Sequence, residues 1–116
     1  FIDADRLLAV GGDYRADSLT TQTIALSDDG GRSWRSAEDA GLHLSHKYRS
    51  CILALNPEDW LAISRTGASF TQNGGRDWTE SALQFYSASR AGEYIWFSGS
   101  NGRIGRIAIK QLWQQR

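Results

Sequence analysis

The chain is a series of short apolar or alternating stretches that are separated by clusters of glycine and polar residues. The stretches with strand-like composition cover residues 6–10, 20–26, 48–55, 60–64, 67–71, 85–89, 94–98 and 103–109. They lack the 3.6-residue period that a longer amphipathic helix would show, and β-branched and aromatic residues recur in them. Twelve glycines against one proline fit tight turns between short strands. The pattern predicts an all-β fold.

One octet occurs twice. Ser27-Asp28-Asp29-Gly30-Gly31-Arg32-Ser33-Trp34 is matched position for position by Thr71-Gln72-Asn73-Gly74-Gly75-Arg76-Asp77-Trp78, and the copies start 44 residues apart (71 − 27). Asp29 and Asn73 have side chains that can bond nearby backbone N–H groups, and the glycines permit a left-handed turn. A repeat of roughly 40–50 residues with turn signals is typical of β-propeller blades.

The octets resemble the Asp-box, or BNR repeat, whose pattern is Ser/Thr-x-Asp-x-Gly-x-Thr-Trp. The first copy matches at Ser27, Asp29, Gly31 and Trp34. The second matches at Thr71, Gly75 and Trp78, with Asn73 in place of the Asp and Asp77 in place of the Thr. In proteins that carry it, the box is a structural turn between the two outer strands of a blade. The resemblance therefore implies that these residues support the fold and lie away from the ligand-binding face.

Aligning the repeats predicts a β-propeller fragment of about two and a half four-stranded blades. Residues 1–40 would form a partial blade with a box, residues 41–82 a full blade with a degenerate box, and residues 83–116 a closing blade without one. Known propellers close with roughly 4–8 blades, so the rest of a propeller, or further copies of the chain, would be needed to close the ring. We interpret the chain as the C-terminal piece of a larger propeller, because its first residues fall inside a repeat. Self-assembly of the short chain into a closed ring is the alternative.

Within Asp-box proteins the chain is most similar to the photosystem II stability/assembly-factor-like group and its bacterial relatives. The resemblance rests on the segments 8–12, 27–34, 48–50, 71–78 and 96–104. It implies a non-catalytic propeller that serves as a scaffold for binding or assembling a protein partner. It also favours a periplasmic or secreted location.

Sialidases and other propeller glycosidases also carry Asp-boxes, which gives a second hypothesis. Such enzymes need two carboxyl groups, or a Tyr nucleophile with a partner acid, and a sialidase also needs several arginines around the substrate carboxylate. Tyr48 and Arg49 at the start of one inner strand, and Arg90 after the next, are the candidate binding residues, together with His43 and His46 in the connecting loop. They do not complete a catalytic set, so catalytic residues would lie upstream. Carbohydrate stacking is an alternative role for Trp60, Tyr86, Tyr94 and Trp96, for which we expect packing between blades.

The charge balance and the remaining motifs exclude other classes of function. Thirteen Lys and Arg balance thirteen Asp and Glu, so the net charge of zero gives no general reason to expect nucleic acid as a partner. No stretch approaches the roughly 20 apolar residues of a membrane span, so we expect no membrane insertion. His43 and His46 are three residues apart but have no further ligands at suitable spacing, and we predict neither a metal nor a cofactor. Cys51, in an apolar run, is interpreted as a buried small side chain.

Overall fold

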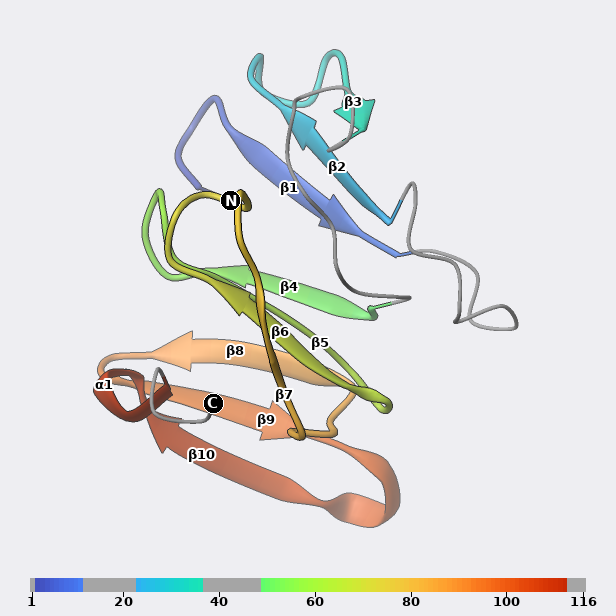
Figure 1. The fold of residues 1–116 in the computed structure, drawn as a ribbon, viewed down its shortest axis with the longest axis vertical. Coiled ribbons are helices and arrows are strands. Elements are labelled where there is room, and N and C mark those ends of the chain that lie inside the picture. Colours follow the sequence, from blue (N-terminus) through green and yellow to red (C-terminus); the bar gives the residue numbers. More distant parts are fainter. Residues whose placement is uncertain (1, 12–22, 37–48, 113–116) are drawn as a thin grey trace.

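The computed structural model describes residues 2–11, 23–36 and 49–112, and these residues form three antiparallel sheets (Figure 1). The first sheet has the order β1-β2-β3, with β1 at Leu7–Val10, β2 at Ile24–Ser27 and β3 at Arg35–Ser36. The second has the order β4-β5-β6-β7, formed by Cys51–Ala54, Trp60–Ser64, Gly67–Thr71 and Thr79–Ser81. The third has the order β8-β9-β10, formed by Ser87–Ala91, Tyr94–Ser98 and Ile104–Ala108. Figure 1 shows the sheets stacked in chain order, which confirms the predicted all-β fold.

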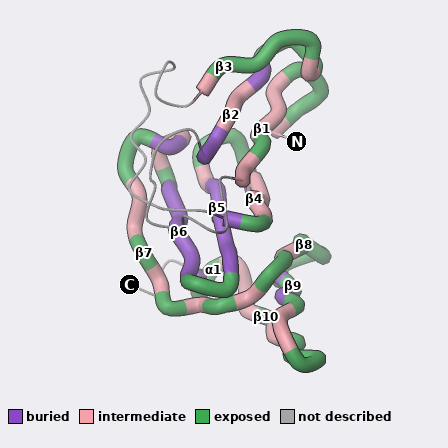
Figure 2. Tube along the Cα trace, turned by 90° about the vertical axis from the view of Figure 1, so that its right-hand side faces the viewer, coloured by how far each residue is buried: buried purple, intermediate pink, exposed green. Residues whose placement is uncertain are grey.

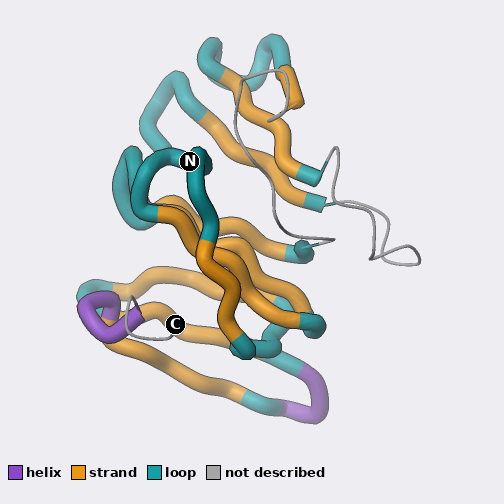
Figure 3. Tube along the Cα trace, viewed as in Figure 1, coloured by secondary structure: helices purple, strands orange, loops and turns teal. Residues whose placement is uncertain are grey.

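Helical structure in the described residues is confined to two short segments (Figure 3). A 3-10 turn, η1 at Ser100–Gly102, joins β9 to β10, and Asn101 there has a φ of 57°. The helical turn α1, Ile109–Leu112, follows β10 directly and stands where the second sheet has its octet. No helix in the described ranges is long and apolar enough to cross a membrane.

The strand bounds match the sequence prediction closely in the middle of the chain and less well at the inner strands. β5, β6 and β9 have the predicted bounds. The inner strand of the third sheet was predicted at 85–89 and lies at Ser87–Ala91. The strand continues to Ala91 because the turn residue is Gly92, whose φ is 60°. It begins two residues late because the Phe85 ring leaves the strand path to stack on Phe97, with ring centroids 5.0 Å apart.

The core lies between the second and third sheets. Strand β9 alternates, so that Ile95 and Phe97 face the second sheet while Tyr94 and Trp96 face away. The buried cluster comprises Leu55, Leu61, Ile63, Ala68, Phe70, Ile95, Phe97 and Leu112. Burial of each large member stabilises the fold by about 1.5–3 kcal/mol. Leu112 of α1 thus ties the segment after β10 to the core.

The most deeply buried strands are not the ones that the sequence indicated. The run at 48–55 was predicted to be covered on both faces, but β4 within it is only partly buried. Strands β5 and β6 are buried at every position, as Figure 2 shows. The reason is position in the sheet: β5 and β6 are its two central strands and have a hydrogen-bonded strand on each side, whereas β4 is an edge strand.

Candidate functional site

The first octet is a turn closed by its own side chains. Ser27 Oγ accepts a hydrogen bond from the Gly31 N–H at 2.9 Å, and Asp29 Oδ1 accepts one from the Ser33 N–H at 2.9 Å. Trp34 Nε1 donates to the Gly31 carbonyl at 3.0 Å. The Ser33 hydroxyl and backbone, followed by the Ser27 hydroxyl, lower the pKa of Asp29 to about 2. Every polar group named here is used within the turn, so the octet is a structural element.

The second octet makes the same turn with one donor and acceptor exchanged. Thr71 Oγ1 accepts from the Gly75 N–H at 3.1 Å, and Asn73 Oδ1 accepts from the Asp77 N–H at 2.9 Å. In the first octet the Ser33 hydroxyl donates to the Asp29 carboxylate. In the second, Asn73 Nδ2 donates to Asp77 Oδ2 at 2.8 Å. The second octet therefore keeps the bond between these two positions, with the donor on Asn73 and the acceptor on Asp77.

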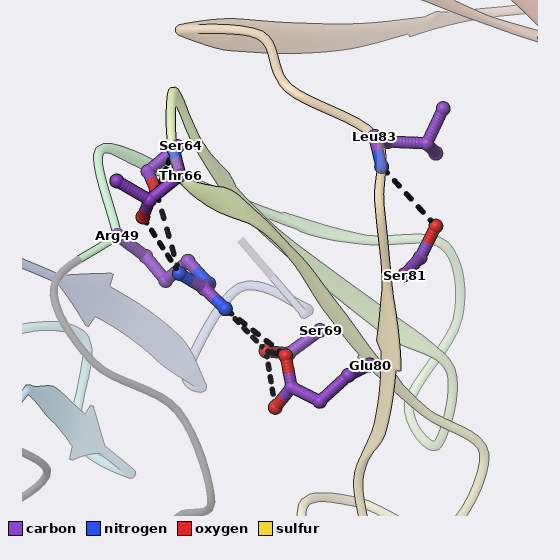
Figure 4. Close-up of polar contacts among 7 residues, drawn as sticks. All are labelled: Arg49, Ser64, Thr66, Ser69, Glu80, Ser81 and Leu83. Atoms are coloured by element: carbon purple, nitrogen blue, oxygen red, sulfur yellow. Dashed lines mark hydrogen bonds and ion pairs between the residues drawn. The ribbon is translucent and has the colours of Figure 1, made fainter.

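Arg49, a predicted binding residue, lies inside the protein, where its side chain ties strands of the second sheet together (Figure 4). The residue is 4% exposed. Its Nη1 donates to Ser64 Oγ at 3.3 Å, and its Nη2 donates to Ser69 Oγ at 3.0 Å and to Glu80 Oε2 at 3.1 Å. Burial lowers the pKa of Arg49, an effect that the charge and the hydrogen bond of Glu80 oppose. The hydrogen bonds of this guanidinium thus hold three strands of the second sheet together.

Arg90 lies at the opposite end of the inner strands. Arg49 precedes the start of β4, whereas Arg90 is the last residue but one of β8. Its Nη1 donates to the Leu55 carbonyl, just after β4, at 2.8 Å, and its Nε donates to the Gly92 carbonyl at 3.0 Å. The structure therefore does not bring the two predicted arginines together. Tyr48, His43 and His46 lie outside the described residues.

Arg90 borders an open cavity of about 380 Å³ at the end of the third sheet. The lining comes from the β8–β9 turn and from the junction of β10 with α1, and it consists of Arg90, Glu93, Tyr94, Ala108, Ile109 and Lys110. Two cations and one carboxylate give the lining a net charge of +1. The cavity thus combines an aromatic ring, an aliphatic wall and a cationic rim, which suits an extended polar or acidic segment of a protein.

Sequence reasoning found Arg90 but missed Lys110 and the role of Tyr94. One feature of the sequence could have indicated this site: residues 110–113 stand where a third octet would be expected. A segment without the octet must pack against the end of the third sheet in another way than the octets do in the first two sheets. Within the described part of the chain no group of three or more His, Cys, Asp or Glu residues could hold a metal ion.

A second cleft, of about 280 Å³, lies between the first and second sheets. Arg6, Arg35 and Arg76 line it, together with the carboxylates of Asp28 and Glu58. Arg35 forms an ion pair with Asp28 at 2.8 Å, and Arg6 forms one with Asp3, also at 2.8 Å. Two of its three arginines are therefore already neutralised, which makes it the weaker candidate.

The four aromatic residues expected to pack between blades divide into two groups. Trp60 is buried and lies 6.4 Å, centroid to centroid, from the ring of Trp78, as expected. Tyr86, Tyr94 and Trp96 are exposed in this chain. Tyr94 and Trp96 stand on the face of the third sheet that points away from the second.

Comparison with known proteins identifies the fold. No family model matches the sequence, and no significant match to a curated protein was found. Among solved structures the chain is similar to YCF48 bound to D1 peptide, with a TM-score of 0.65 and 18% sequence identity. The match covers 91% of this chain and 34% of the YCF48 chain, so the present chain spans about a third of that protein. The chain therefore has the fold of a β-propeller fragment, with the architecture of about one third of YCF48.

Proposed function

We propose that the chain belongs to a non-catalytic Asp-box β-propeller that binds another protein, in the manner of an assembly scaffold. The observation that carries this proposal is the structural similarity to YCF48, which is bound to D1 peptide in the matched structure. The two octets support the Asp-box assignment, because their bonds are those of a structural turn at equivalent places in two successive sheets.

The cavity at the end of the third sheet is the proposed contact surface. Arg90 is held by two backbone carbonyls and retains further N–H donors, since a guanidinium has five. Tyr94 is 37% exposed, and the Arg106 guanidinium lies 4.6 Å from its ring centroid, which fixes the ring for contact. A preorganised aromatic residue beside cations resembles the anchors of protein interfaces.

The glycosidase hypothesis gains no support from this cavity. A sialidase would need several arginines around the substrate carboxylate, and Arg90 is the one arginine among the described residues that line the cavity. The residues there fit binding better than hydrolysis.

The proposal is tested by fluorescence anisotropy with labelled D1 peptide as the probe. We expect saturable binding and a roughly tenfold higher Kd for Lys110→Glu and for Tyr94→Ala, since a tenfold change corresponds to about 1.4 kcal/mol. Arg32→Glu changes an exposed cation in the first octet, away from the cavity, and is the matched control. Absence of saturable binding, or a Kd that both cavity variants leave unchanged, contradicts the proposal.

A further inference from the structure

The cleft between the first and second sheets has both of its walls within the described chain. The first sheet contributes Arg6, the start of β1 and the end of β2, and the second contributes the β4–β5 turn, Trp60 at the start of β5 and part of the second octet. A further sheet would stack on the outer face of the first or third sheet, so these walls do not depend on one. The volume of about 280 Å³ is just below the roughly 300–1,000 Å³ of sites for drug-sized ligands, so the cleft has room for one small molecule.

Trp60 is part of the wall of this cleft and carries a donor without a partner. The residue is 3% exposed, and its indole Nε1 is buried without a hydrogen bond. Trp78, whose ring lies 6.4 Å away, donates its own Nε1 to the Gly75 carbonyl at 3.0 Å. A buried N–H that lacks a partner costs about 1–3 kcal/mol. An oxygen acceptor supplied by a ligand would recover part of that cost.

Two charged side chains of the cleft are also without partners. Arg76, in the second octet, and Glu58, in the β4–β5 turn, both line the cleft and are exposed. Neither side chain forms a hydrogen bond or an ion pair in the described structure. A Cβ on Gly74 would lie 3.2 Å from Glu58 Oε2, so this carboxylate stands over the octet that carries Arg76. A free donor group and a free acceptor group therefore belong to the same wall.

The charges of the described lining favour an uncharged ligand over an ion. The other two arginines of the cleft are already paired with carboxylates, at 2.8 Å each. An anion that approached Arg76 would meet the carboxylate of Glu58, and a cation that approached Glu58 would meet Arg76. Hydroxyl groups suit such a set, since each one both donates and accepts hydrogen bonds. The cleft therefore fits a small molecule that carries several hydroxyl groups.

We propose that this cleft binds a single sugar unit, with the Trp60 N–H and Arg76 as donors to its hydroxyl groups and Glu58 as an acceptor. Leu7 and Leu26 also line the cleft and supply apolar surface for the C–H groups of a sugar ring. The inference is independent of the proposed function, because the cleft shares no described lining residue with the cavity at the end of the third sheet.

Two-dimensional ¹H–¹⁵N NMR of the 116-residue chain tests the proposal, because the indole N–H of each of the five tryptophans gives its own signal. Trp60→Phe identifies the Trp60 signal by its loss. We expect D-glucose, D-galactose or D-mannose to shift this signal saturably, and Arg76→Met and Glu58→Leu each to raise the Kd roughly tenfold. Arg32→Met is the matched control and should leave the Kd unchanged. Arg32 has the place of Arg76 in the first octet and is exposed, but it is not among the described lining residues.

Two further titrations separate the possible sources of the ligand. The methyl glycoside of the sugar that binds resembles a sugar at the end of a glycan, so an equal Kd identifies a glycan end as the ligand and loss of the shift identifies the free sugar. Inorganic phosphate is the probe for an anion site. The proposal would be overturned if phosphate shifted the Trp60 signal and no sugar did, if no sugar gave a saturable shift, or if Arg76→Met and Glu58→Leu both left the Kd unchanged.

Discussion

Replacing Asn73 by Asp tests whether the two octets are held by the same bonds with donor and acceptor exchanged. Asn73 Oδ1 accepts from the Thr71 hydroxyl and from the Asp77 N–H, and an Asp at this position keeps both bonds. Its Nδ2 donates to Asp77 Oδ2 at 2.8 Å, and this is the bond that the change removes. Two carboxylate oxygens would then face each other at that separation.

The cost follows from this geometry. Two unit charges 2.8 Å apart repel by about 1.5 kcal/mol even in water. The lost bond to a charged acceptor adds on the order of 1 kcal/mol at an exposed site, and rotation of Asp77 recovers part of the sum. We expect Asn73→Asp to lower the free energy of unfolding by about 2 kcal/mol at pH 7, or the melting temperature by about 8 °C.

Thermal and urea unfolding monitored by circular dichroism measure this effect. Asp29→Asn, the reverse exchange in the first octet, is the matched control and should cost less, because the Ser33 hydroxyl can accept from the new amide. The double variant Asn73→Asp with Asp77→Ser restores the pairing of the first octet and should recover most of the loss. A double variant no more stable than Asn73→Asp alone would refute the reasoning.

Three further predictions concern stability. Arg49→Ala removes the bonds that join β5, β6 and β7 and should lower the free energy of unfolding by about 2–4 kcal/mol, measured in urea. Glu80→Gln changes a half-exposed side chain and should lower it by about 1 kcal/mol or less. The folded pKa of Asp29 is about 2 against a reference of 3.8, so its stabilisation is complete above pH 3.8 and is lost as the pH falls toward 2. Asp29→Asn should flatten the acid limb of a stability–pH profile in that window. Gly105→Ala would place a Cβ 3.1 Å from the Phe85 ring and should cost about 1–3 kcal/mol, partly recovered when Phe85→Leu is added.

The alternation of residues and the turn residues between strands were sufficient to predict the all-β fold from the sequence. Strand β9 was predicted with its bounds because alternation and the glycine-containing turns on either side agree. The start of β8 was wrong because Phe85 has strand-like character but packs its ring over Gly105 and against Phe97 instead. These contacts join residues 12 and 20 positions apart (97 − 85 and 105 − 85), and they depend on how the strands pair, which the local alternation of residues 85–89 does not show.

The candidate site was less predictable than the fold. Arg49 follows Tyr48 at the start of a strand, and this pattern suggests an exposed binding group. The guanidinium turns inward instead, because its partners Ser64, Ser69 and Glu80 lie 15 to 31 residues further along the chain. The cavity at Arg90 forms only because β10 and α1 bring Lys110 to the β8–β9 turn. Its existence depends on how the third sheet ends, which the repeat pattern does not specify.

The burial of β5 and β6 makes the second sheet the part of the molecule that we expect to unfold last. Backbone ladders run within each sheet, and among residues 2–11, 23–36 and 49–112 few backbone bonds join one sheet to the next, such as the one from the Arg49 N–H to the Gly11 carbonyl at 3.2 Å. Each sheet is therefore a separate hydrogen-bonded unit, held to its neighbours mainly by side chains. We expect amide hydrogen exchange to be fastest in β3 and β10 and slowest in β5 and β6. The molecule would then unfold from its two ends inward, and the second sheet would be the last unit to lose its protection.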